Sequence, residues 1–110
     1  MSRVIESPVK RFSGTVVLSD PLTYPQVFAF GDALEESRTE EAMRDVRRQI
    51  YALLPGVLAC VEEWHLENVP AHPARDTFPA TPSKPAAQLA AWLVNEITAL
   101  YDEAENVPLE

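Results

Sequence analysis

The chain has 110 residues, of which 46% are hydrophobic and 24% are charged, and its formal net charge is −8. A chain of this length forms one domain around one hydrophobic core, and this balance of residue types is typical of globular proteins. The negative charge argues against binding to nucleic acid or to an anionic membrane surface, because both require clustered lysine and arginine. We therefore expect neither as a partner.

Cys60 is the single cysteine, so the chain cannot form an internal disulfide. No apolar run approaches the ~18 to 20 residues that a membrane-spanning helix needs. The N-terminal sequence "MSRVIESPVKRF" also lacks the apolar block of a signal peptide. These features predict a cytoplasmic protein.

Residues 10–18, "KRFSGTVVL", alternate in a way that favours a β-strand. One face would carry Phe12, Gly14, Val16 and Leu18. A single strand leaves backbone donors and acceptors unpaired, so it needs a neighbour. Residues 2–6, a short strand near "WHLEN" and another subunit are the three possible partners.

Residues 23–36 are predicted to form a helix with a well-defined start. Thr23 and Gln26 have the spacing of a capping box, and Pro25 falls in the first turn, where its missing N–H costs nothing. Apolar residues then follow at helical spacing, namely Val27, Phe30 and Leu34.

Residues 39–64 continue the helical pattern. The apolar positions recur every three or four residues at Met43, Val46, Ile50, Leu54, Val57 and Val61. Pro55 removes a backbone donor and Gly56 weakens a helix, so we expect either a kinked helix or two helices that end near Trp64.

Residues 65–84 are predicted to be a proline-rich arm, because so many prolines favour extended backbone. A last helix follows over 84–104, with Ser83 as its N-cap and Pro85 in its first turn. The expected fold is a small single-domain α+β protein over residues 1–110. It is mainly α, with three to four helices and a minor N-terminal β-strand or hairpin.

Residues 61–85 and Cys60 hold the only side chains that suggest chemistry. Cys60, His65 and His72 do not have the recurrent spacing of a closed four-ligand zinc site. Cys60 and His65 are five residues apart, which on a helix points them to different sides and argues against a nucleophile and base pair. We expect no enzyme activity, no catalytic residue, no cofactor and no metal, and we interpret this stretch as a hinge or ordered arm.

The order of the segments resembles that of the small tail assembly chaperones of long-tailed bacteriophages. In that family a helix ends at a V-x-x-W-x-L-like sequence, here Val61 to Leu66. A loop with a P-x-T-P-like element follows, here Pro79 to Pro82, and then an amphipathic helix, here "LAAWLVNEITALY". The resemblance covers most of residues 12–104.

The resemblance implies a non-enzymatic factor in the cytoplasm of the infected bacterial host. Such a chaperone binds the tape measure protein, keeps that long helical chain soluble and assists assembly of the tail tube protein around it. Family members self-assemble, so we expect a homo-oligomer. The strand at residues 10–18 favours an alternative, a structural tail or neck protein of the virion that exchanges a strand or helix with its neighbours.

A partner helix binds through a few apolar anchors at three-and-four spacing. The candidate partner-binding residues are Leu89, Trp92, Leu93, Ile97 and Tyr101 of the last helix, together with Trp64. The alternative is that these six side chains only complete the core of the domain.

Overall fold

The computed structural model describes residues 2–69 and 83–105. The strands are β1 (Ser2–Glu6), β2 (Gly14–Ser19) and β3 (Val61–Leu66). The helices are α1 (Tyr24–Ser37), α2 (Glu40–Met43), α3 (Val46–Cys60) and α4 (Lys84–Glu105), and a short 3-10 turn spans Lys10–Phe12. The predicted fold class is confirmed, since the chain is mainly helical with a small antiparallel sheet.

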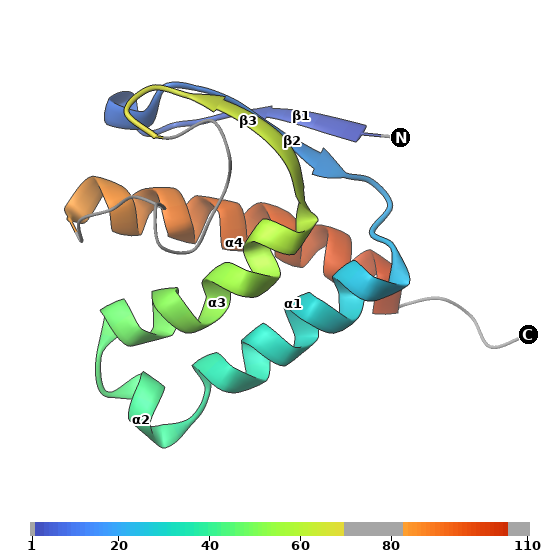
Figure 1. The fold of residues 1–110 in the computed structure, drawn as a ribbon, viewed down its shortest axis with the longest axis vertical. Helices are drawn as coiled ribbons and strands as arrows, with labels where there is room; N and C mark the ends of the chain where they lie inside the picture. Colours follow the sequence, from blue (N-terminus) through green and yellow to red (C-terminus); the bar gives the residue numbers. More distant parts are fainter. Residues whose placement is uncertain (1, 70–82, 106–110) are drawn as a thin grey trace, which may run out of the picture.

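The sheet and the helices form separate layers (Figure 1). The three strands lie on one side of α4, and α3 packs against α4. Helices α1 and α3 run antiparallel, side by side, and α2 joins them at the end far from the sheet. One face of the sheet therefore contributes to the core, and its other face is turned away from the helices.

β2 is the central strand, in the order β1-β2-β3, and both of its pairings are antiparallel. Residues 2–6 and the segment near "WHLEN" both pair with it, so two of the three possible partners are present. The strand starts at Gly14 rather than at residue 10. Gly14 has φ +139°, and an added Cβ would overlap the carbonyl oxygen of His65, so glycine is required where the strand begins.

The predicted start of α1 is confirmed in detail. Gln26 N–H donates to Thr23 Oγ1 at 3.4 Å, and Thr23 N–H donates to Gln26 Oε1 at 2.8 Å. This reciprocal pair is a capping box, and proline occupies the first turn as expected.

The helical region after α1 is interrupted, but not where the sequence predicts. Thr39 caps the short α2, and Asp45 then caps α3 by accepting a hydrogen bond from the backbone N–H of Arg47 at 2.9 Å. Pro55 lies inside α3 without ending it. The region therefore forms two helices, as one of the two predicted alternatives has it, but they are divided before the Asp45 cap and not at Pro55.

The prediction that helix continues to Trp64 is also wrong, since residues 61–66 form β3. The register of β2 and β3 shifts between Val17 and Leu18, which leaves Glu62 as an extra residue on β3. This bulge explains why the buried positions Val61, Trp64 and Leu66 do not alternate strictly. The hinge prediction therefore fails for residues 61–66, and also at its C-terminal end, where α4 begins at Lys84. Residues 70–82 of the predicted arm lie outside the described residues.

The core lies where α3, α4 and the inner face of the sheet meet. Its completely buried side chains include Val16 and Leu18 from β2, Phe30 from α1, and Leu89, Leu93 and Ile97 from α4. Two predicted core positions, Met43 and Val46, are instead 63% and 64% exposed. They lie at the α2–α3 junction, at the surface of the helical layer. Within residues 2–69 and 83–105, no helix is long and apolar enough to span a membrane.

Candidate functional site

The cysteine and histidine that suggested chemistry lie on opposite sides of the sheet. Cys60 is completely buried, with its Sγ 4.0 Å from the carbonyl oxygen of Gln26, and burial raises the pKa of its thiol to about 11. Its thiolate, the reactive form, is therefore scarce at neutral pH. His65 is exposed on the outer face, where its Nε2 lies 3.6 Å from Glu63 Oε1. The two side chains cannot act as a nucleophile and base pair.

No cluster of three or more histidine, cysteine, aspartate or glutamate side chains in the described part of the chain could hold a metal ion. His72 and the P-x-T-P-like element lie outside that part. The described residues thus offer no set of three or more such side chains as metal ligands.

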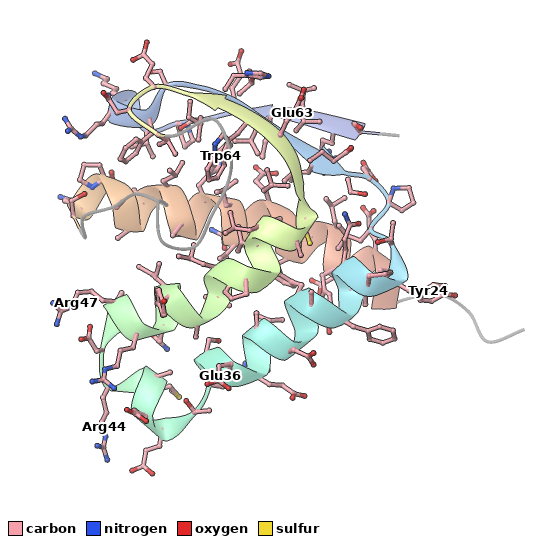
Figure 2. The ribbon with its side chains drawn as sticks, in the orientation of Figure 1. Tyr24, Glu36, Arg44, Arg47, Glu63 and Trp64 are labelled. Atoms are coloured by element: carbon pink, nitrogen blue, oxygen red, sulfur yellow. The ribbon has the colours of Figure 1, made fainter. Side chains whose placement is uncertain are left out.

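Most of the predicted partner-binding residues pack inside the domain. Leu89, Leu93 and Ile97 are completely buried and Trp64 is nearly so, which is the outcome that the core alternative describes. Figure 2 shows Trp64 directed from β3 toward α4, whereas the neighbouring Glu63 points away from the helices. Of the six, only Trp92 and Tyr101 are partly exposed, so in this conformation the predicted residues do not form one exposed contact surface.

An apolar groove lies between α3 and α4, on a face of α4 that the sequence analysis did not select. Its volume is about 520 Å³, within the ~300 to 1,000 Å³ of typical ligand pockets. The apolar lining residues are Val46, Ile50, Leu53, Leu54 and Val57 of α3, and Ala87, Ala90, Ala91 and Val94 of α4. The polar lining residues are Ser37, Gln49, Lys84, Gln88 and Asn95.

The two helices contribute different features to this groove. Leu54, Val57 and Ala90 are buried and form its floor, while Ala91 and Val46 are exposed at its surface. The alanines of α4 leave space above the floor because their side chains end at Cβ. Among the described lining residues, the exposed polar positions carry amides and one lysine but no carboxylate, so an apolar helix there would face no negative charge from these residues.

The sequence does contain a signal for this groove. The residues Ala87, Ala91 and Val94 recur at helical spacing on α4. They lie on a different face of the helix from its large apolar residues. Alanine is also the best helix former, so such a run is easily attributed to helix propensity alone. The face becomes recognisable only when α3 lies beside it.

A second exposed apolar feature lies at the start of α1. The rings of Tyr24 and Phe28, 82% and 65% exposed, are stacked with their centroids 6.5 Å apart. They lie one helical turn apart, and Figure 2 shows Tyr24 pointing outward from the end of the helix. A hollow between α1 and α4 begins beside Phe28 and carries the carboxylates of Asp32 and Asp102. This surface is more polar than the α3–α4 groove.

The tip around α2 is charged, and its charges are paired. Arg44 NH2 lies 3.3 Å from Glu40 Oε1, and Arg48 pairs with Glu41. The hydrogen bond from Arg47 lowers the pKa of the Asp45 carboxyl. Exposed pairs of this kind add little to stability and keep both charge signs in solvent, so we interpret the tip as a solvated surface.

No family model, curated protein or solved structure matches this chain. The description that the structure supports is therefore a mainly helical α+β domain with an apolar groove between α3 and α4.

Proposed function

We propose that this protein is a non-enzymatic chaperone that binds an amphipathic partner helix in the α3–α4 groove. The observation that carries the proposal is the groove itself, since an apolar channel between two helices is the form of surface that receives a partner helix. The lining residues in the described part of the chain include no acidic side chain, which supports the proposal further, because an acidic protein that binds hydrophobic chains needs a contact area without negative charge.

The resemblance to tail assembly chaperones identifies the partner within this proposal. The chaperone would bind the tape measure protein of a long-tailed bacteriophage in the host cytoplasm and assist assembly of the tail tube protein. The tape measure protein is a long, hydrophobic, helical chain, and partner residues at three-and-four spacing would fill the space above Leu54, Val57 and Ala90. In this proposal the contact surface is the groove. It is no longer the set that includes Leu89, Leu93, Ile97 and Trp64, because these residues lie in the core.

Two matched substitutions on α4 test the groove. Ala91 and Ala99 are both exposed on the same helix, but only Ala91 lines the groove. Ala91→Arg places a long charged side chain where the partner helix would lie, so we expect the affinity for the phage's own tape measure protein to fall at least tenfold. Arginine is a good helix former, so both variants should fold.

The measurement is co-purification of the tape measure protein with each variant, followed by titration of a soluble tape measure fragment. Ala99→Arg should bind like the wild type. Equal binding by the two variants would show that the α3–α4 groove is not the contact surface.

A structural role in the virion is the second candidate, and the outer edge of β1, where no strand of residues 2–69 or 83–105 pairs, favours it. An edge strand with unpaired backbone groups can accept a strand from a neighbouring tail or neck protein. Mass spectrometry of purified virions separates the two functions. A structural protein is present at stoichiometric amounts, whereas a chaperone is absent from the mature particle.

A further inference from the structure

We propose that two copies of this chain associate through β1, so that their sheets join into one continuous six-stranded antiparallel sheet. The proposal concerns the sheet and is independent of the groove on the helical side of the molecule. It specifies both the interface and the register of the two strands.

The hydrogen bonds around β2 show which backbone groups of β1 are available. Ser7 N–H donates to the carbonyl oxygen of Gly14 at 2.9 Å, and these two residues continue the β1–β2 register. Hydrogen-bonded and non-hydrogen-bonded pairs alternate along an antiparallel ladder. The backbone N–H and C=O groups that point away from β2 therefore belong to Ser2, Val4 and Glu6.

The other side of β2 is consistent with this assignment. Glu67 N–H donates to the carbonyl oxygen of Ser13 at 2.9 Å, and this pair continues the β2–β3 register. Alternate residues of β2 thus face alternate neighbours, as a regular central strand requires.

The two edges of the sheet differ in how well they are covered. At the outer edge of β3, Trp64 and Leu66 are only 2% and 8% exposed. At the outer edge of β1, Val4 is 63% exposed, and no strand from the described ranges pairs there. Natural proteins usually protect an open edge with proline, bulges or inward-pointing charges. β1 has no proline and no register shift against β2, and its one charge on the inner face, Arg3 opposite Leu18, is paired with Asp20 at 3.9 Å.

A second copy of β1 fits this edge in one register better than in any other. With a twofold axis through Val4, perpendicular to the sheet, Val4 lies opposite Val4 of the second copy and Ser2 lies opposite Glu6. All the outward-pointing backbone groups of both strands are then paired. A shift by two residues leaves a residue at one end of each strand unpaired, and in one direction it places Arg3 opposite Arg3, which like charge disfavours.

The side chains agree with this register. Val4 pairs with Val17 on the outer face of the sheet, so two Val4 and two Val17 side chains would form one apolar strip across the axis. The Ser2 hydroxyl already donates its proton to the Glu62 carboxylate of its own chain, so it does not add a hydrogen bond to Glu6 of the second copy. The apolar strip at the axis is therefore the side-chain contact that supports this register.

The contact between the two β1 strands is short, which limits the affinity of the dimer. Five residues span about 17 Å, so the contact is well below the ~1,600 Å² of a standard stable interface. Each copy also carries a net charge of −8. We therefore expect a weak dimer whose population rises with protein concentration and with salt, since salt screens the repulsion between the copies.

Cysteine cross-linking tests the register directly. Opposed residues of a hydrogen-bonded antiparallel pair have Cα atoms about 5.5 Å apart, which a disulfide spans without distortion. Val4→Cys should therefore form a disulfide dimer under mild oxidation, at least ten times faster than Glu6→Cys. In this register the two Glu6 positions lie four residues out of line, about 13 Å apart.

Two further variants complete this experiment. The double variant Ser2→Cys with Glu6→Cys should cross-link again, because those positions face each other across the contact between the two β1 strands. The wild type provides the background rate, since its only thiol, Cys60, is completely buried. If Val4→Cys cross-links no faster than Glu6→Cys, the proposed register is wrong.

Sedimentation over a range of concentrations tests the association without cross-links. Val4→Pro removes an outward-pointing N–H that β2 does not use, and Val4→Lys places two positive charges at the axis. Both variants should remain monomeric at concentrations where the wild type dimerises, with unchanged circular dichroism. Ala91→Arg, on the helical side, should dimerise like the wild type. Wild-type association in both Val4 variants, or a wild type that remains monomeric because the edge takes a strand of a different protein, overturns the proposal.

Discussion

Gly56→Ala is expected to destabilise the protein, although it replaces a poor helix former with the best one. Gly56 is buried in α3 where that helix packs on α1. A Cβ added there would lie 2.7 Å from the Cβ of Ala33 and 2.8 Å from the Cα of Phe30. The second contact is to main chain, which cannot rotate away, so the two helices would have to move apart.

Two opposing terms set how far Gly56→Ala lowers the free energy of unfolding. Removing glycine from a helix interior stabilises it by about 1 kcal/mol, whereas overpacking a core costs about 1–3 kcal/mol. The upper half of that range applies because the obstruction is backbone, so we expect a net loss of about 1–2 kcal/mol. For a domain of this size, 1 kcal/mol lowers Tm by about 4–8 °C, which predicts a decrease of about 5–15 °C.

Thermal unfolding followed by circular dichroism measures this effect, and Gly31→Ala is the matched control. A Cβ at Gly31 would lie 3.1 Å from the hydroxyl of Tyr101, at the end of a partly exposed side chain that can shift slightly. The stability of the Gly31→Ala variant should stay within about 1 kcal/mol of the wild type, because the gain in helix propensity offsets the small shift of Tyr101. A Gly56→Ala variant at least as stable as the wild type would refute this account of the α1–α3 contact.

Two further predictions concern single side chains. Thr23→Ala removes the N-cap of α1 and should lower the free energy of unfolding in urea by about 1 kcal/mol; an unchanged value would show that the cap does not stabilise the fold. Burial raises the pKa of Cys60 from 9.0 to about 11, so between these pH values the folded protein keeps a proton that the unfolded chain releases. The free energy of unfolding should therefore fall as pH rises through that window. Cys60→Ala should lack this component, and an equal fall in both proteins would contradict the assignment.

The starts of α1 and α4 could be predicted from sequence because capping acts over very few residues. The Thr23 hydroxyl caps α1, and Ser83 Oγ accepts a hydrogen bond from Ala86 N–H at 3.2 Å at the start of α4. Each cap depends on side chains no more than three positions away. No distant part of the chain is needed to specify it, so α1 and α4 start where the sequence predicts.

Strand β3 could not be recognised locally. Val57, Val61 and Trp64 have a spacing that also fits a helix, and the bulge at Glu62 removes the alternation that identifies a strand. β2 supplies the hydrogen bonds that make this segment a strand, and β2 lies more than forty residues earlier. Pairing with a distant strand therefore overrides the local pattern.

The sequence by itself determined that α4 is an amphipathic helix with large apolar residues on one face. It did not determine which apolar face would be covered. The sheet and α3 bury Leu89, Leu93 and Ile97, and α3 then lies beside Ala87 and Ala91 to form the groove. Burial depends on contacts between elements far apart in the chain, so the spacing of residues within one helix cannot distinguish a core face from a binding face.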